Sequence, residues 1–397
     1  MPQRYRRQPT EYTLHNSATI VRGGADYFER IDQIADGARY TLHLQTYIFD
    51  EDETGKRVAA ALMRAAQRGV AVYVLLDGYA SQKLSAAFIN SLRSAGVHFS
   101  YFSPFLQSSF FYIGRRLHHK LIVADGSAAM AAGINVSNRY NDIGDRQAWL
   151  DWALYVEGEA AKGIADVCVH VWNRSRKRPQ CPQAIAVGAP GMPASTYPVC
   201  PVRIRRNDWV FYKTEISATY RELFRTAESH VTIMTSYFWP PQRLLRAMAR
   251  ASARGVKIKL ILTGKADVPL AKYAERYLYK WLFRHNIEVY EYQRNILHGK
   301  SAVSDNKWLT IGSYNVNNIS AFASVELNLD VKDNKLATEL NNKFETIIAA
   351  DCVQINKDTF WESSGLSSKV FYYLAYRIIH MVFFLFTFYF TRRRSVD

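Results

Sequence analysis

The sequence predicts an α/β protein built from two similar halves. Apolar, β-branched runs that read as strands alternate with amphipathic segments that read as helices, which favours mixed sheets flanked by helices. The same order of segments occurs twice along the 397 residues, and such a repeat indicates an internal duplication. The paired segments are TYIFD at 46–50 with SYFWP at 236–240, AAQRGVAVYVLLDG at 65–78 with ASARGVKIKLILTG at 251–264, and VHFSYF at 97–102 with IEVYEY at 287–292.

Taken in order, each half is expected to run strand, helix, strand, helix, strand, and then a strand that carries a short polar motif. The helices expected at 55–68 and 241–254 both end in Arg-Gly-Val, with Gly at the position where a helix commonly stops. With 48% apolar residues, a chain of this length can bury two substantial cores.

The polar motif is His-x-Lys-x-x-x-x-Asp, and it occurs once in each half, followed by Gly-x-Asn in the first half and by Gly-Ser-x-Asn in the second. The first copy is His118, Lys120 and Asp125 with Gly133 and Asn135, and the second is His298, Lys300 and Asp305 with Gly312, Ser313 and Asn315. The His-to-Asn separation is 17 residues in both copies. A single short motif arises by chance, but two copies in matching register, each with the same downstream turn, indicate one shared chemistry.

The motif spacing places its polar groups on one side of a strand. LIVAD and SAVSD read as short buried strands that run into turns at Asp125-Gly126 and Asp305-Asn306. Because side chains alternate along a strand, His118 and Lys120 point the same way and His119 points to the other side. An imidazole, an ammonium group and an Asn amide together form an anion pocket that suits the non-bridging oxygens of a phosphodiester. Such a pocket needs no metal or other cofactor.

These residues resemble the phospholipase D superfamily, whose signature is the paired His-x-Lys-x4-Asp with Gly-x-Asn. The flanking segments resemble the bacterial cardiolipin synthases over about residues 14–350, including WLDWALYVEG after the first motif and SVELNLDV after the second. Ala132 departs from the pattern, since the family usually has Gly there. The resemblance implies two phospholipase D-type α/β domains related by internal duplication that share one active site.

The resemblance also implies roles for the two histidines. One imidazole attacks phosphorus, the other protonates the departing alkoxide, and an acceptor hydroxyl then resolves the phosphohistidine. His118 is the implied nucleophile and His298 the implied acid and later base, although the sequence alone does not rank them. The groups implied to bind or support the phosphate are Lys120, Lys300, Asn135, Asn315 and Ser313.

Four acidic residues are candidates for supporting roles. Asp125 and Asp305 either orient the imidazoles or hold the fold. Glu326 and Asp151 stand where the family often has an acidic residue that supports the opposite histidine, and a structural salt bridge is the competing account for both.

The chain divides by composition into four parts. We expect a first phospholipase D-like domain at 1–173, a Pro/Gly-rich basic connector at 174–201, a second domain at 202–366 and an aromatic tail at 367–397. The RSRKR run at the start of the connector either contacts acidic headgroups or is a solvated linker.

The formal charge of +16 indicates an anionic partner, either nucleic acid or an acidic membrane surface. Cys168, Cys181, Cys200 and Cys352 are scattered without zinc-type spacing, as expected of reduced packing residues in a cytosolic protein. The N-terminal residues contain no apolar stretch and are not expected to form a signal peptide.

The tail favours a membrane. Residues 378–391 are almost wholly apolar and aromatic and precede three arginines at 392–394, but fourteen residues fall short of the roughly 20 needed to cross a bilayer. An interfacial helix on anionic headgroups, a true tail anchor and a soluble core helix are the three interpretations. The aromatic run at 105–113 either lines an acyl-chain groove or packs in a core.

The function implied by the resemblance is transfer of a phosphatidyl group to phosphatidylglycerol, giving cardiolipin and a small alcohol at the cytoplasmic face of the inner membrane. Phosphatidylglycerol and phosphatidylethanolamine are both candidate donors. The alternatives are phospholipase D hydrolysis or other head-group exchange, including phosphatidylserine-type synthesis, then a nuclease, then a membrane scaffold with a dead site. The aromatic tail disfavours the nuclease, so no nucleic-acid partner is expected, and the oligomeric state is left open.

Overall fold

The computed structural model describes most of the two halves and the helix that follows them. Only the backbone is described for Leu366, His380 and residues 382–391. The described residues are 11–103, 115–174, 181, 197–208, 213–266, 268–317, 324–357, 360 and 365–391. The aromatic run at 105–113, the arginines at 392–394 and most of the basic connector therefore lie outside them.

The first half forms a mixed sheet with the strand order β4–β3–β2–β6–β7–β8–β1. β2, β3 and β4 are parallel, and the remaining neighbours are antiparallel. Its elements are β1 (Thr13–Arg22), α1 (Ala25–Gly37), β2 (Thr41–Thr46), α2 (Glu53–Gln67), β3 (Ala71–Asp77), α3 (Ala86–Ser94), β4 (His98–Phe102), β5 (Arg116–Leu117), β6 (Lys120–Ala124), β7 (Ala128–Ala132), the short 3-10 helix Asn138–Tyr140, β8 (Trp152–Gly158) and α4 (Glu159–Asn173).

The second half repeats this order as β13–β12–β11–β14–β15–β16–β9, with β17 added beyond β13. The expected internal duplication is thus present in the topology as well as in the motifs. Its elements are β9 (Val199–Asp208), β10 (Lys213–Thr214), α5 (Glu215–Thr226), β11 (His230–Thr235), α6 (Gln242–Ala253), β12 (Lys257–Thr263), α7 (Pro269–Arg284), β13 (Ile287–Tyr292), β14 (Lys300–Ser304), β15 (Trp308–Gly312), β16 (Ser324–Val331), α9 (Asn334–Asp351) and β17 (Cys352–Ile355).

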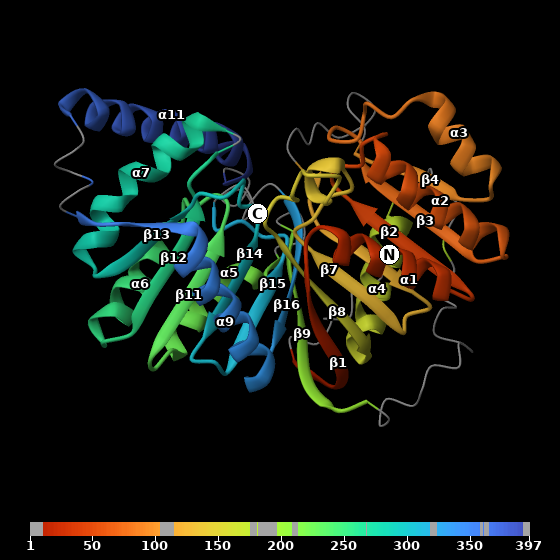
Figure 1. Cartoon of the computed structure of the whole chain (residues 1–397), viewed down its shortest axis with the longest axis horizontal. Coiled ribbons are helices and arrows are strands. Elements are labelled where there is room, and N and C mark those ends of the chain that lie inside the picture. The colour runs from red at the N-terminus through yellow and green to blue at the C-terminus, as the bar shows by residue number, and fades with distance from the viewer. Residues whose placement is uncertain are drawn as a thin grey trace.

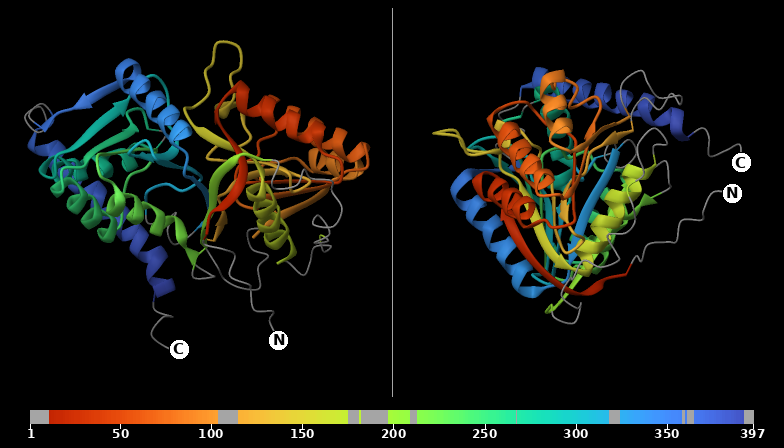
Figure 2. Two further views of the ribbon diagram at one scale, coloured as in Figure 1. Left: turned by 90° about the horizontal axis from the view of Figure 1, so that it is seen from below. Right: turned by 90° about the vertical axis from the view of Figure 1, so that its right-hand side faces the viewer.

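Strands from both halves join the two sheets. β1 pairs with β8 along most of its length, and its first residues pair with β9 of the other half. β16 of the second half also pairs in parallel with β5 of the first. Figure 1 shows β1 and β9 running between the two lobes, and the left view of Figure 2 shows the lobes side by side. The halves therefore form one body around their junction.

Local sequence explains the turns that carry the motifs. Asp125 and Gly126 both have positive φ, as do Asp305 and Asn306, and each pair sits at the centre of a tight turn between antiparallel strands. Two consecutive positive φ angles define the type I′ hairpin, for which Asp, Asn and Gly are the favoured residues. The turns expected from the sequence at both motifs are confirmed.

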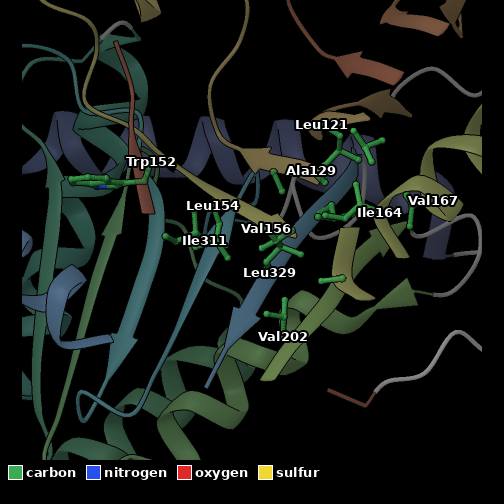
Figure 3. Packing of buried hydrophobic residues seen from close by; sticks show 14 of the residues in the cluster. Leu121, Ala129, Trp152, Leu154, Val156, Ile164, Val167, Val202, Ile311 and Leu329 are labelled. Atoms are coloured by element: carbon green, nitrogen blue, oxygen red, sulfur yellow. The ribbon is translucent and has the colours of Figure 1, made fainter. Parts of the chain in front are cut away.

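Three clusters of buried apolar residues fill the molecule. One lies between the first sheet and α1, α2 and α3, and a second lies between the other sheet and α5, α6 and α7. The third is shared by both halves: it joins α4 and α9 to the inner faces of the two sheets. Figure 3 shows this shared core, where Leu154 of β8 is drawn beside Ile311 of β15 and Val156 of β8 beside Leu329 of β16. The four cysteines are free, and three of them are buried.

The C-terminal segment forms helix α11 (Leu366–Thr391), which packs along α7. Tyr372 and Ala375 are 8% and 1% exposed and belong to the apolar cluster of the second half. Tyr273 and Tyr277 of α7 make ring contacts with this inner face. Among the residues whose placement is described, no helix has the length and apolar character needed to cross a bilayer. The domain limits expected at 173, 201 and 366 stay a prediction.

Candidate active site

Both motif histidines lie at the junction of the halves, and each is held by the backbone of the opposite half. His118 and His298 lie two residues before Lys120 and Lys300, which are the first residues of β6 and β14. The His118 N–H donates to the carbonyl of Val325 (3.0 Å), and the His298 N–H donates to the carbonyl of Leu150 (2.8 Å). The two contacts are related by the internal repeat, so one junction positions both imidazoles.

A carboxylate of the opposite half also holds each imidazole. Glu326 Oε2 lies 2.9 Å from His118 Nδ1, and Asp151 Oδ2 lies 2.6 Å from His298 Nδ1. Both carboxylate side chains are fully buried, while the imidazole side chains are 16% and 12% exposed. Because Nδ1 of each ring faces its carboxylate, Nε2 lies on the opposite edge of each ring. The crossed contacts implied by the resemblance are therefore present, and the catalytic roles stay predictions.

The two lysines are buried beside these pairs. Lys120 Nζ donates to the His118 carbonyl, and Lys300 Nζ donates to the His298 carbonyl and lies 3.7 Å from Asp151 Oδ2. The charge on Lys300 also acts on His118, and the charge on Lys120 acts on Asp151. These cross-half effects place both motifs in one site.

Burial sets the protonation of the site. It lowers the pKa of His118, and the nearby lysine charges lower it further, although Glu326 opposes them. Burial also lowers the pKa of Lys120 to about 7 and raises the pKa of Asp151 to about 6. A neutral His118 is what a nucleophile requires, and perturbed groups of this kind cluster at functional sites.

The motif aspartates lie away from the imidazoles and hold loops. Asp125 accepts the backbone N–H groups of Arg39, Tyr40 and Thr41 at 2.8–2.9 Å. Asp305 does the same for residues 228–230 and also accepts the Ser229 hydroxyl. The sequence left two roles open for Asp125 and Asp305. The role of orienting the imidazoles is wrong, because the carboxylates that contact the imidazoles are Glu326 and Asp151. Each aspartate instead ties its turn to the start of the central strand β2 or β11.

The two motif asparagines differ in what their amides contact. The Asn135 carbonyl accepts the N–H of Ile48 (3.1 Å), and its NH2 donates to the hydroxyl of Tyr140 (2.9 Å). In the second half the equivalent N–H, that of Phe238, donates to Glu275 instead (3.2 Å). Asn315 is 7% exposed, and within the described part of the chain its Oδ1 has no hydrogen-bond partner. Asn315 is thus the more available of the two for a ligand.

The residue two positions before the motif asparagine is Gly133 in the first half and Ser313 in the second, and the difference has a steric reason. The Ser313 hydroxyl donates to Glu326 Oε2 at 2.5 Å, so it supports the carboxylate and not a phosphate directly. Its counterpart is Gly133, where an added Cβ would lie 2.6 Å from both carboxylate oxygens of Asp151. Asp151, which is shorter than Glu326, reaches His298 because Gly133 leaves room for it.

Aromatic rings that the sequence analysis did not single out flank the imidazoles. The ring centroid of Tyr47 lies 4.8 Å from that of His118, and the centroids of Tyr140 and Trp149 lie 5.0 and 6.0 Å from that of His298. Tyr47 was detectable because it occupies the repeated position of TYIFD and SYFWP.

As expected from alternation, His119 points away from the site, and its Nε2 contacts Gln45 Oε1 at 2.9 Å. In the described residues no group of three His, Cys, Asp or Glu side chains is arranged to hold a metal.

Comparisons with known proteins agree with this architecture. The family model described as "Cardiolipin synthase, PLD-like domain" matches residues 31–148 and 220–348. "Cardiolipin synthase B" of Salmonella typhi is 35% identical over 366 residues, covering 87% of this chain and 85% of that protein. "Cardiolipin synthase" of Oceanobacillus iheyensis is 27% identical over 370 residues, covering 90% of this chain and 74% of that protein.

A solved structure supports the fold. The crystal structure of phosphatidylserine synthase from Haemophilus influenzae Rd KW20 superimposes with a TM-score of 0.73 at 14% identity, covering 94% of this chain and 95% of that one. At that identity the likeness shows the fold alone. With the family match over both halves and the duplicated motif at one junction, the chain belongs to the cardiolipin synthase family of phospholipase D-like proteins.

Proposed function

We propose that this protein transfers a phosphatidyl group to a hydroxyl of phosphatidylglycerol, giving cardiolipin and a free small alcohol. The observation that carries the proposal is the pair of crossed His–carboxylate contacts, because it engages Nδ1 of both imidazoles at one junction with two buried lysines. The curated relatives named as cardiolipin synthases support the choice of substrate class.

In the first step, His118 Nε2 attacks phosphorus of the donor lipid. The bond from phosphorus to the head-group oxygen breaks, and His298 Nε2–H gives its proton to the departing alkoxide. Glu326 holds the Nδ1–H of His118 and stabilises the positive charge that the ring gains. The low pKa that burial gives His118 supports its assignment as the nucleophile.

In the second step, His298 takes the proton of the acceptor hydroxyl. The acceptor oxygen then attacks phosphorus, and the phosphorus–nitrogen bond to His118 breaks. Lys120 and Lys300 would neutralise the non-bridging oxygens in both steps, with the amide of Asn315 as a further donor. Asn135 would act indirectly, by holding Tyr140 against His298.

Substitution of the two histidines tests the shared site. His118→Ala and His298→Ala should each abolish cardiolipin formation from dispersed phosphatidylglycerol, and the double variant should be no worse, because groups that act as a unit are not additive. His98→Ala, an exposed histidine outside the site, is the control. Half activity in each single variant would mean two independent sites. Release of phosphatidic acid without cardiolipin would favour the phospholipase D alternative.

We further propose that the protein works on an anionic membrane, which it meets through the outer face of α11. Six apolar side chains of this face are 42–57% exposed, whereas Tyr372 and Ala375 on the inner face are buried. Lipid substrates and a formal charge of +16 suit an anionic bilayer as the occupant of this face. The six residues are Val370, Phe371, Tyr373, Leu374, Ile378 and Met381.

Polar substitution of this face is a sharper test than truncation, because truncation would also remove Tyr372 and Ala375 from the second core. A Val370→Gln, Leu374→Gln, Ile378→Gln triple variant should lose binding to vesicles that contain phosphatidylglycerol while keeping its unfolding temperature, whereas Phe371 is left in place because its ring contacts Tyr273 of α7. Val353→Gln is the matched control, since Val353 is 52% exposed on β17. Unchanged vesicle binding in the triple variant would place the membrane contact elsewhere on the chain.

A further inference from the structure

One arginine shares the strand face of the catalytic residues but has no counterpart in the other half. Arg116 lies two residues before His118, and the alternation of the chain places Arg116, His118 and Lys120 on the same side. The intervening residues confirm this direction: Leu117 is fully buried in the shared core, and His119 contacts Gln45. The equivalent position before His298 is Ile296.

The Arg116 guanidinium is held through its Nη1 by an ion pair with the buried Asp77 and by a backbone carbonyl. Its Nη1 lies 3.5 Å from Asp77 Oδ1 and donates to the carbonyl of Ser103 (3.3 Å). The Asp77 carboxylate already accepts three backbone N–H groups, from Leu117 at 2.8 Å, Tyr79 at 3.0 Å and Ala80 at 3.1 Å. Within the described residues, Nε and Nη2 of Arg116 make no hydrogen bond, and the side chain is 19% exposed. One edge of the fork is therefore available to an anion.

Tyr47 connects Arg116 to the reacting centre. The Tyr47 ring lies 4.8 Å from the His118 ring and 5.3 Å from Lys120 Nζ. The charges of Arg116 and Asp77 both act on the Tyr47 hydroxyl. The Arg116 Cζ lies 5.6 Å from the ring centroid of Tyr79, which is half-exposed. Arg116 thus lies next to the tyrosine that contacts the nucleophile.

Because Arg116 has no counterpart in the second half, it is expected to bind a group that the two substrates do not share. The transferred phosphate lies between two duplicated His-Lys pairs, so its recognition is expected to be duplicated too. When the acceptor is phosphatidylglycerol, the substrates carry one additional phosphodiester, one glycerol unit away from the attacking hydroxyl. A neutral alcohol or water carries no such group.

We propose that Arg116 binds the phosphodiester of the acceptor lipid beside the catalytic phosphate and so selects an anionic lipid over water or a simple alcohol as acceptor. The inference rests on the proposed phosphatidyl transfer. Nε–H and Nη2–H would bind two phosphate oxygens as a fork, while Asp77 and Ser103 hold the third side of the guanidinium. Arg116 is then a specificity-determining residue that takes no part in bond breaking.

Competition between two acceptors tests this role. Phosphatidylglycerol dispersions are supplied with 1-butanol, and cardiolipin and phosphatidylbutanol are measured from the same reaction, so that both products arise from one phosphoenzyme. Arg116→Gln should lower the cardiolipin-to-phosphatidylbutanol ratio about tenfold or more, as expected for loss of two charge-assisted hydrogen bonds between the guanidinium and a phosphate. The rate of phosphatidylbutanol formation should stay near that of the unmodified protein. Arg116→Lys, which keeps the charge but not the fork, should give an intermediate ratio.

Arg139→Gln is the matched control. Arg139 lies on the His298 side, with its guanidinium over the ring of Trp149, and its side chain is 45% exposed and paired with Asp50. Its loss should leave the product ratio unchanged. If Arg116→Gln lowers both products equally, or if Arg139→Gln alone shifts the ratio, the assignment of Arg116 is overturned. If the unmodified protein forms neither product, the proposed phosphatidyl transfer itself fails.

Discussion

Replacing Glu326 by Gln tests whether the cross-half carboxylate supports catalysis or is a structural salt bridge. The substitution keeps the side-chain volume in a fully buried position and removes the charge. Glu326 Oε2 accepts from two groups, the His118 ring and the Ser313 hydroxyl. In the Gln variant the neutral amide oxygen replaces this charged acceptor, so the contact with the His118 ring loses its charge assistance.

The size of the effect follows from the kind of bond that is lost. A hydrogen bond to a charged group contributes about 1.5–3 kcal/mol, and about 1.4 kcal/mol corresponds to a factor of ten. Glu326→Gln should therefore lower kcat/KM for cardiolipin formation by roughly 10- to 150-fold. Ser313→Ala removes the other donor and leaves the charged contact to His118, so it should lower kcat/KM less than Glu326→Gln does.

Trapping of the covalent intermediate separates the roles of the two carboxylates. With labelled donor lipid and a rapid denaturing quench, Glu326→Gln should slow the appearance of labelled protein, because it weakens the nucleophile His118. Asp151→Asn should instead let labelled protein accumulate, because without the carboxylate His298 is a stronger acid in the first step and a weaker base in the resolving step. The reverse pattern would exchange the assignments of the two histidines. If Glu326→Gln falls within threefold of the unmodified protein and equals Ser313→Ala, the reasoning is refuted and the contact is a structural salt bridge.

Three further predictions follow from protonation, turn geometry and ligand chemistry. A plot of kcat/KM against pH should rise as Asp151 ionises, with a pKa of about 6, because the ionised carboxylate is the stronger acceptor for the His298 N–H. It should fall as Lys120 loses its proton, with a pKa of about 7. Lys120→Arg should move the falling limb to higher pH, and an unmoved limb would contradict the assignment. Asp125→Ala should lower the free energy of unfolding, measured by denaturant titration, by about 2–5 kcal/mol, because three backbone N–H groups lose their acceptor in a positive-φ turn. The value of kcat per folded molecule should change little. Asp125→Asn should lower the free energy of unfolding less. Activity should survive treatment with a chelator, because lysine and imidazole groups bind the phosphate; complete loss that one metal restores would show the pocket was misread.

Local patterns were sufficient to predict the secondary structure and the direction of the motif side chains. Strand alternation correctly separated His118 and Lys120 from His119, and the turn residues correctly located both hairpins. Gly69 and Gly255, at φ 89° and 93°, follow α2 and α6 where the helix stops were expected. These features depend on neighbours a few residues apart, whose preferences are intrinsic to the chain.

Other features were decided by contacts between distant segments. Asp125 and Asn135 belong to the motif, yet one holds the loop at 39–41 and the other is bound to Ile48 and Tyr140. No local rule distinguishes Asn135 from Asn315, because the difference arises when Glu275 on α7 takes the N–H of Phe238. In the same way, the apolar tail pattern did not reveal that one face of α11 packs on α7 and the other stays exposed.

By itself the sequence determined that the chain is a duplicated α/β protein with two sets of phosphate-binding and nucleophilic groups, because periodicity and turn chemistry act over short distances. Only the tertiary structure decided how those sets combine. Glu326 is 208 residues from His118, and Asp151 is 147 residues from His298. They meet because β1 and β9 join the two sheets and the shared core packs the halves together. Burial at that junction then shifts the pKa values of Lys120 and Asp151, which no residue pattern specifies in advance.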